Sequence, residues 1–366
     1  MAIAGVLEAV WRLFRLPGEP PLTRYTASIM GNSQTYDISR IKEELGYEPK
    51  VGWKEGVDGF VASLGAGLEV DIKDNGEKSH THTHTHAEER LRLEGSSVTV
   101  LRSGVTCARE WLFGSGDGWG KIDIPALFAL MRHPVEGAVL FDTGYSTRFF
   151  SAAAGFPYAL YRLGTPLFMT AEEDPGKRVK ECGVDPGDVR MIIISHFDPD
   201  HVGGLHDFPN AQVVCSWRAW LQARGKTGFA ALKARVLPGL IPADLAARLT
   251  LLPDLSGPPI GPFSRSLDLF QDGSIRLVEL PGHAPGMLGA FVAREGEGPL
   301  FLCADACWSM APIEAGTPRK GVHRFIAHDR GAQYETYAAL MRLRQEMPEV
   351  TIVPAHCPAT AARLLD

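Results

Sequence analysis

The sequence lacks the features that mark membrane-spanning, secreted or nucleic-acid-binding proteins. Its 366 residues contain no apolar run close to the roughly 20 residues that a membrane-spanning helix needs. At the start, no basic segment is followed by an uninterrupted apolar one, as a secretion signal requires. No dense basic stretch offsets the formal net charge of −6. We therefore expect no membrane partner and no nucleic-acid partner.

Cysteine pairs are absent as well. The six cysteines show no CxxC spacing, which would mark a zinc ribbon, an iron–sulfur cluster or a redox-active pair. A chain with 45% hydrophobic residues and this length can form a core without disulfide bonds. We expect reduced thiols and a cytoplasmic location.

A polar stretch over residues 71–95 divides the chain. It contains SHTHTHTH between charged flanks, and we expect a solvated linker there. Alternating histidines in an extended chain lie on one face and could hold a metal ion. Nothing around them would orient such ligands, so a tract that binds metal weakly is the simpler interpretation. The linker separates a helical extension, residues 1–70, from a catalytic domain, residues 96–366.

The extension, residues 1–70, is too short for a catalytic domain of its own. Its stretch PPLTRYTASIMGNSQTYDISRIKEELGYEPK resembles the C-terminal tail of an extended short-chain dehydrogenase of the 3β-hydroxysteroid dehydrogenase kind. The glycine-rich dinucleotide fingerprint is absent, and Tyr36 is followed four residues later by Arg40 instead of the catalytic lysine. We expect no NAD chemistry here, and the helices offer a surface for a homodimer.

The remaining domain alternates short apolar strands with turns and a few helices, which is typical of a layered α/β sandwich. We expect strands at 98–101, 138–141, 191–194, 212–215, 275–280, 289–292, 300–303 and 351–354. We expect helices at 175–182, 218–223, 245–249 and 333–345.

The strongest chemical signal is the stretch MIIISHFDPDHVGGL, in which a strand rich in β-branched residues ends at Ser195. Four potential metal ligands follow within six residues: His196, Asp198, Asp200 and His201. Such closely spaced side chains can converge only where the backbone turns sharply. Gly203 and Gly204 permit the close backbone approach that this turn requires.

Further polar residues follow apolar strands elsewhere: Asp142, His283, Asp305 and His356. Taken singly, each is better explained by a capped strand end or a hydrogen-bonded core histidine. With Asp142 set aside, the combined set holds four histidines and three aspartates at strand ends of one sandwich. Nitrogen and oxygen donors in that number are what a dinuclear metal site requires.

With these motifs in this order, the chain resembles the metallo-β-lactamase superfamily over roughly residues 98–356. The resemblance implies an αββα four-layer sandwich and two divalent metal ions, zinc first, with iron or manganese as alternatives. By position, it implies that the seven ligands are His196, Asp198, Asp200, His201, His283, Asp305 and His356, with Asp305 bridging and Asp142 in support. The motifs SHFDPDHVGGL and PGHAPGM are most similar to the lactonase and glyoxalase II branch.

Two residues depart from the superfamily pattern. Asp198 stands where the motif His-x-His-x-Asp-His has its second histidine. A carboxylate there reaches about as far as an imidazole that binds through Nδ1, and it favours harder ions such as iron. Trp308 lies near the place where acyl-homoserine lactonases are expected to have a tyrosine, and an indole cannot supply that phenol.

The leading hypothesis is a dinuclear metallo-hydrolase in which two ions share a hydroxide that attacks the carbonyl carbon of a lactone, ester or thioester. Asp200 would orient this hydroxide or carry a proton to the leaving group. The alternative is a di-iron, oxygen-active oxidoreductase, motivated by Asp198, which would need an electron donor that the sequence does not contain. Aromatic residues before the ligand motif favour an apolar acyl or ring compound as the small-molecule substrate.

Overall fold

The computed structural model describes residues 96–110, 119–316 and 327–365. The chain divides into two units, Met1–Thr85 and His86–Asp366. The dehydrogenase-like extension and the histidine-rich linker predicted from the sequence lie outside the described residues.

The first sheet has seven strands in the order β4-β1-β2-β3-β5-β6-β7. The strands are β1 (Ser97–Arg109), β2 (Lys121–His133), β3 (Gly137–Phe141), β4 (Leu167–Phe168), β5 (Val189–Ile193), β6 (Gln212–Ser216) and β7 (Leu249–Leu252). Strands β1, β2 and β3 pair antiparallel, whereas β3, β5, β6 and β7 run parallel. The carboxyl ends of β3 and β5 therefore meet at the same edge of the sheet.

The second sheet has five strands in the order β12-β11-β10-β9-β8. They are β8 (Leu267–Asp268), β9 (Ile275–Glu279), β10 (Leu288–Val292), β11 (Leu300–Ala304) and β12 (Thr351–Pro354). Strands β11 and β12 are parallel and the other pairs are antiparallel. The carboxyl ends of β11 and β12 also lie at one edge.

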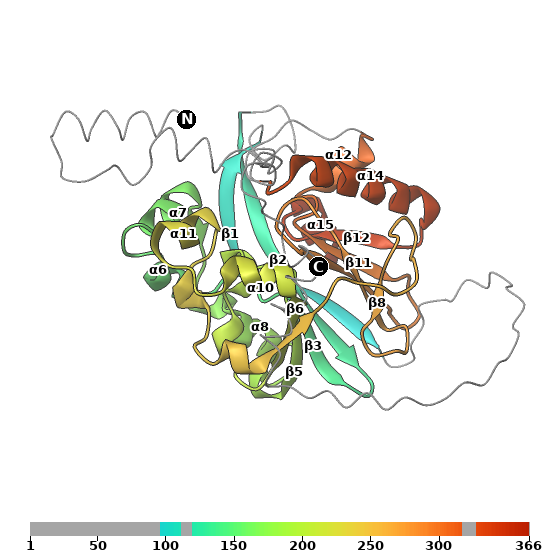
Figure 1. The fold of residues 1–366 in the computed structure, drawn as a ribbon, viewed down its shortest axis with the longest axis horizontal. Helices are drawn as coiled ribbons and strands as arrows, with labels where there is room; N and C mark the ends of the chain where they lie inside the picture. Colours follow the sequence, from blue (N-terminus) through green and yellow to red (C-terminus); the bar gives the residue numbers. More distant parts are fainter. Residues whose placement is uncertain (1–95, 111–118, 317–326, 366) are drawn as a thin grey trace, which may run out of the picture. The chain divides into compact units, whose positions relative to one another are not determined.

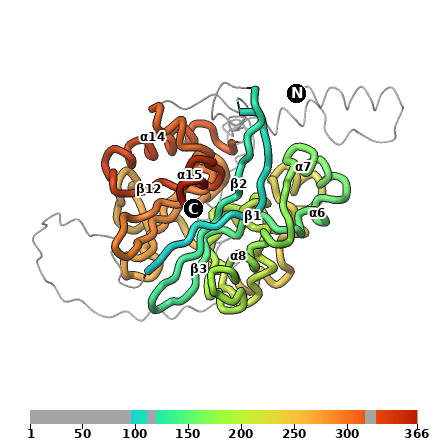
Figure 2. The backbone as a smooth tube through the Cα atoms, turned by 180° about the vertical axis from the view of Figure 1, so that it is seen from behind, coloured from blue at the N-terminus to red at the C-terminus, as the bar shows by residue number. Residues whose placement is uncertain are grey.

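Helices cover the outer faces of both sheets (Figures 1 and 2). On the side of the first sheet lie α6 (Arg148–Ala152), α7 (Ala159–Gly164), α8 (Pro175–Glu181), α9 (Pro199–Val202), α10 (Trp217–Ala223) and α11 (Gly228–Lys233). On the side of the second lie α12 (Met310–Glu314), α14 (Arg330–Glu346) and α15 (Pro358–Leu364). Short 3₁₀ helices cover Ala171–Glu173, Pro186–Asp188, Leu205–Asp207, Pro238–Leu240 and Leu245–Arg248. This arrangement is the predicted αββα sandwich. Among the described helices, none is both long and apolar enough to cross a membrane.

Strand β2 shows why two cores form. Its side chains alternate between them: Phe128 and Leu130 pack in the core beneath helices α6 to α11, whereas Leu127 and Met131 pack in the core that includes the second sheet. A strand buried on both faces is apolar throughout and does not alternate between apolar and polar residues. The same division holds in β5, where Ile193 packs in the core that includes the second sheet.

The elements predicted within residues 96–366 correspond to observed ones, with one difference. The helix expected at 245–249 is a single 3₁₀ turn, Leu245–Arg248, and Leu249 already begins β7. The eight expected strands fall on β1, β3, β5, β6, β9, β10, β11 and β12. The structure adds β2, β4, β7 and β8, which the sequence analysis did not predict.

Candidate metal centre

Strand ends position the seven residues that the sequence predicted as ligands. Strand β5 ends just before His196, and Asp198 is the N-cap residue of the four-residue helix α9, which carries Asp200 and His201. Pro199 opens α9, a position where its missing N–H leaves no donor unsatisfied. The other three ligands follow β9, β11 and β12: His283, Asp305 and His356.

Close backbone packing holds α9 against the turn after β3. A Cβ atom on Gly203 would lie 2.6 Å from the carbonyl oxygen of Gly144, so only glycine fits there. Thr143 N donates to the carbonyl oxygen of His201 at 2.8 Å. Just after β3, Asp142 has a φ of 58°, a left-handed conformation that is uncommon for residues other than glycine but that aspartate tolerates better than most. The expectation that paired glycines permit close approach is therefore confirmed at this turn.

One half of the centre, which we call the carboxylate half, consists of Asp200, His201, His356 and Asp305 Oδ1. Asp305 Oδ1 lies 3.1 Å from His201 Nε2 and 3.1 Å from His356 Nε2. Asp200 Oδ2 lies 3.1 Å from His356 Nε2. Within the part of the chain that the structure describes, all ion pairs of Asp200 and Asp305 are with histidines.

The other half, which we call the arginine half, consists of His196, Asp198, His283 and Arg235. Asp198 Oδ2 lies 3.2 Å from His283 Nε2 and 3.6 Å from His196 Nε2. Arg235 Nε donates to the same carboxylate oxygen at 2.6 Å, and Arg235 Nη2 lies 3.2 Å from His283 Nε2. No sequence motif points to Arg235, because it follows helix α11 in a segment without candidate ligands.

The donor atoms fit a divalent cation. Three buried atoms have no hydrogen-bond partner among the residues that the structure describes: His196 Nε2, His201 Nε2 and Asp305 Oδ1. Leaving such an atom unsatisfied costs about 1–3 kcal/mol. Three groups of residues each bring their ligand atoms within 4.8 Å of one another. The groups are His196, His201 and Asp305; His196, Asp198 and His283; and Asp200, His201 and His356. Imidazole and carboxylate donors at this spacing suit zinc, iron or manganese.

Hydrogen bonds behind the histidines fix their orientation. His201 Nδ1 lies 2.7 Å from Asp142 Oδ2, and this carboxylate also accepts bonds from Ser195 N and Oγ, each at 2.8 Å. His356 Nδ1 donates to the carbonyl oxygen of Pro125 at 2.9 Å. In both histidines these bonds leave Nε2 directed at the centre, as is usual for metal-binding imidazoles. Asp142 has the supporting position expected from the sequence.

The two halves differ in the charges that surround their histidines and carboxylates. Burial lowers the pKa of His283, and the neighbouring Arg235 charge lowers it further. Burial also opposes protonation of His356, but Asp305 and Asp200 outweigh it and raise the pKa of His356 to about 10. Although burial would raise the pKa of Asp198, the Arg235 charge, together with His196, holds it well below its usual range. The carboxylate half therefore attracts positive charge, whereas Arg235 already supplies it in the arginine half.

Trp308 contacts the centre through its indole nitrogen. Nε1 donates to Asp305 Oδ2 at 2.9 Å, and the ring centroid lies 6.4 Å from that of His283 and 6.3 Å from that of His356. Its side chain is therefore a hydrogen-bond partner of the carboxylate expected to bridge two ions.

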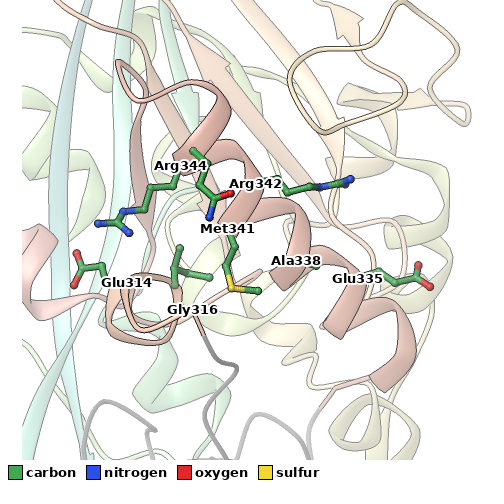
Figure 3. Close-up of a pocket in the computed structure, with 9 residues that line it drawn as sticks. Glu314, Gly316, Glu335, Ala338, Met341, Arg342 and Arg344 are labelled. Carbon is green, nitrogen blue, oxygen red and sulfur yellow. The ribbon is translucent and has the colours of Figure 1, made fainter.

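A surface hollow between α12 and α14 lies apart from these residues (Figure 3). It has a volume of about 590 Å³, and its lining includes Glu314, Glu335, Met341 and Arg342. None of the seven predicted ligands lines it. The hollow is therefore not part of the candidate metal centre.

Comparisons with known proteins identify one family and several relatives. The sequence profile of the metallo-beta-lactamase superfamily matches residues 125–356. The chain is 29% identical to the N-acyl homoserine lactonase AttM of Azorhizobium caulinodans, over 51% of this chain and 67% of that protein. It is 26% identical to AttM of Agrobacterium fabrum, over 64% and 83%. It is 27% identical to the probable metallo-hydrolase Rv2300c of Mycobacterium tuberculosis, over 61% and 72%.

Solved structures show the same fold. A structure of a B. thuringiensis AiiA variant with N-decanoyl-L-homoserine bound at its active site aligns with a TM-score of 0.53 at 20% identity, covering 73% of this chain and 95% of that one. An N-acyl homoserine lactone hydrolase with N-hexanoyl-L-homoserine at its catalytic metal centre aligns with a TM-score of 0.53 at 21% identity, with the same coverage.

Proposed function

Because the chain belongs to the metallo-beta-lactamase superfamily, we propose that it is a hydrolase that opens a lactone or cleaves a related ester with a bound divalent metal. The observation that carries this proposal is the convergence of His201, His356 and Asp305. The Nε2 atoms of both histidines lie 3.1 Å from Asp305 Oδ1, and no described residue forms a hydrogen bond with His201 Nε2 or Asp305 Oδ1. The relatives named as N-acyl homoserine lactonases favour a lactone with an apolar acyl chain as the substrate class.

A bound divalent ion would supply Lewis acidity, which polarises a carbonyl group and lowers the pKa of water. Asp200, His201 and His356, with Asp305, are the residues that would hold it. Asp142 would keep His201 Nε2 directed at the ion through the bond to Nδ1. The residues of this chain thus provide both the ligands and the contacts that orient them.

Asp200 is the carboxylate best placed to move a proton. Its side chain is 13% exposed, compared with 9% for Asp198, 4% for Asp305 and 1% for Asp142. A group that accepts a proton from water and delivers it to a leaving group must reach the substrate side of the centre. Greater exposure and the contact with His356 support this role for Asp200.

The oxygen-active alternative does not gain support. It was motivated by Asp198 as an additional carboxylate ligand, and this carboxylate forms a 2.6 Å ion pair with Arg235. The relatives described above are named as lactonases or as a probable metallo-hydrolase. Hydrolysis is the activity class that both observations favour.

The deciding experiment is a substrate panel on the purified full chain, loaded in parallel with zinc, manganese and iron. The panel contains N-acyl homoserine lactones of increasing acyl length, a simple γ-lactone, an aryl ester and a thioester. We expect metal-dependent lactone opening that improves with acyl length and is lost in Asp200→Asn. The matched control is Asp254→Asn, because that exposed carboxylate pairs with Arg218 outside the centre. Turnover that is unchanged in Asp200→Asn, or absent with every ester and lactone, would refute the proposal.

A further inference from the structure

We infer that the guanidinium of Arg235 takes the place of the first metal ion, so that the centre holds one divalent ion per chain. The resemblance to the superfamily implied two ions. The inference rests on the proposed metal centre, but it concerns metal content and not the bond that is hydrolysed.

Arg235 engages two of the three ligand atoms that a first ion would need, and the third, His196 Nε2, has no hydrogen-bond partner among the described residues. Its Nε donates to Asp198 Oδ2 at 2.6 Å, and its Nη2 lies 3.2 Å from His283 Nε2 and donates to the His283 carbonyl oxygen at 3.1 Å. A zinc ion would have to approach the same two atoms to about 2.0–2.2 Å. The planar guanidinium and the ion therefore exclude each other, by space and by charge.

The two oxygen atoms of the Asp305 carboxylate face different halves of the centre. Its Oδ2 is the oxygen nearer His283, at 3.5 Å, and it already accepts a bond from Trp308 Nε1. Within the described ranges its Oδ1 has no hydrogen-bond partner, and it lies 3.1 Å from the Nε2 atoms of both His201 and His356. The carboxylate is thus open toward one ion only.

The backbone at Arg235 supports a dedicated role for this side chain. After α11 ends, Arg235 has a φ of 57°, and Val236 N donates to the carbonyl oxygen of Ala231 at 2.9 Å. Helices commonly end in this way, with glycine in the left-handed position, because a Cβ atom is unfavourable there. Arginine at that position carries a backbone penalty, and its contacts with Asp198 and His283 offset it.

Charge balance points the same way. Asp198 is buried, and a buried carboxylate needs a counter-charge, which Arg235 provides. Asp200 and Asp305 pair only with histidines in the described part of the chain. One arginine and one divalent ion together balance the three carboxylates that face the centre, with Asp142 left out of this count because it lies behind His201.

Native mass spectrometry and elemental analysis of the full chain test this inference. In every protein compared, His80, His82, His84 and His86 are replaced by serine, so that the histidine tract does not add bound metal. Each protein is stripped with a chelator, treated with excess zinc and desalted. We expect one ion per chain with Arg235 in place and two per chain in Arg235→Gln. Arg218→Gln is the matched control, because Arg218 pairs with Asp254 away from the centre, and it should retain one ion.

Two further variants test the inference if Arg235→Gln does not fold. Arg235→Gly suits the left-handed backbone, and Arg235→Gly combined with Asp198→His restores the histidine that the superfamily motif has at this position. Two tightly bound ions with Arg235 present would overturn the inference, as would a single ion in all three Arg235 variants. No bound ion would refute the metal centre as a whole. One ion in a protein that hydrolyses nothing would leave this inference standing and count against the proposed reaction.

Discussion

The two halves of the centre contain similar residues and balance their charge differently. In the arginine half, Asp198 pairs with Arg235, and the pKa of His283 falls because of burial and the nearby arginine. In the carboxylate half, Asp305 and Asp200 raise the pKa of His356 to about 10 against the effect of burial. The difference teaches that a ligand motif alone does not set the number of ions, because a side chain from outside the motif can neutralise one position.

The largest effect on zinc affinity is expected from a matched pair of substitutions, one in each half: His356→Ala and His283→Ala. We expect His356→Ala to lose at least about 100-fold in zinc affinity, because it removes a ligand of the only ion. His283→Ala should change that affinity by less than about tenfold, since its Nε2 contacts Arg235. Competition with a chromophoric chelator measures both. Equal losses of zinc affinity in the two variants would show that the two halves bind metal equivalently and would contradict the assignment of the ion to the carboxylate half.

A smaller loss is expected when the support of His201 is weakened. Asp142→Asn should lower zinc affinity by about 10- to 100-fold with the fold kept, because His201 Nδ1 loses its charged partner. The chain offers a matched control in Asp272→Asn. Asp272 contacts His133 at the same 2.7 Å distance but lies outside the centre. If both substitutions lower the affinity equally, the effect is one of general stability and not of histidine orientation.

The pH dependence of stability tests the excess negative charge of the carboxylate half. The folded pKa of His356 is about 10, above its ordinary value of 6.5, so protonation stabilises the chelator-treated fold fully below pH 6.5. This stabilisation is lost as the pH rises toward about 10. We expect the Tm of the chelator-treated protein to fall by about 5 °C between pH 6.5 and 9.5. The decrease should be smaller in His356→Gln, and an equal decrease in that variant would assign the effect to other groups.

Most strands were predictable because short apolar runs end in turn residues, but β2 was not. Its stretch IPALFALM has no alternation that separates a strand from a buried helix, since both of its faces are buried. Pro125 adds to the ambiguity, because proline is unusual inside a sheet. In the structure it lies where the register between β1 and β2 shifts, and its carbonyl oxygen accepts the bond from His356. The sequence could not show this role, which depends on the partner strand.

The seven candidate ligands could be proposed from the sequence because each follows an apolar strand, a local pattern that a single sequence displays. Arg235 has no such pattern. It lies 37 residues after Asp198, in the stretch ALKARVLPG, where an arginine after a short helix is an ordinary surface residue. Its left-handed backbone and its direction into the centre follow from tertiary packing. Positions in the motif could therefore be predicted, whereas the charge that balances one of them could not.

The smallest effect should come from Trp308→Phe, which keeps the ring but removes the bond from Nε1 to Asp305 Oδ2. With Arg235 in place, we expect zinc affinity to change by less than about threefold, because the bound ion faces Oδ1. In Arg235→Gln, the same substitution should strengthen binding of the second ion by about threefold to tenfold, because Oδ2 becomes available as a ligand. Competition titrations of the four proteins of this cycle measure the coupling between Trp308 and Arg235. A coupling of zero would show that Oδ2 does not belong to the arginine half, and the division of Asp305 between the halves would then be wrong.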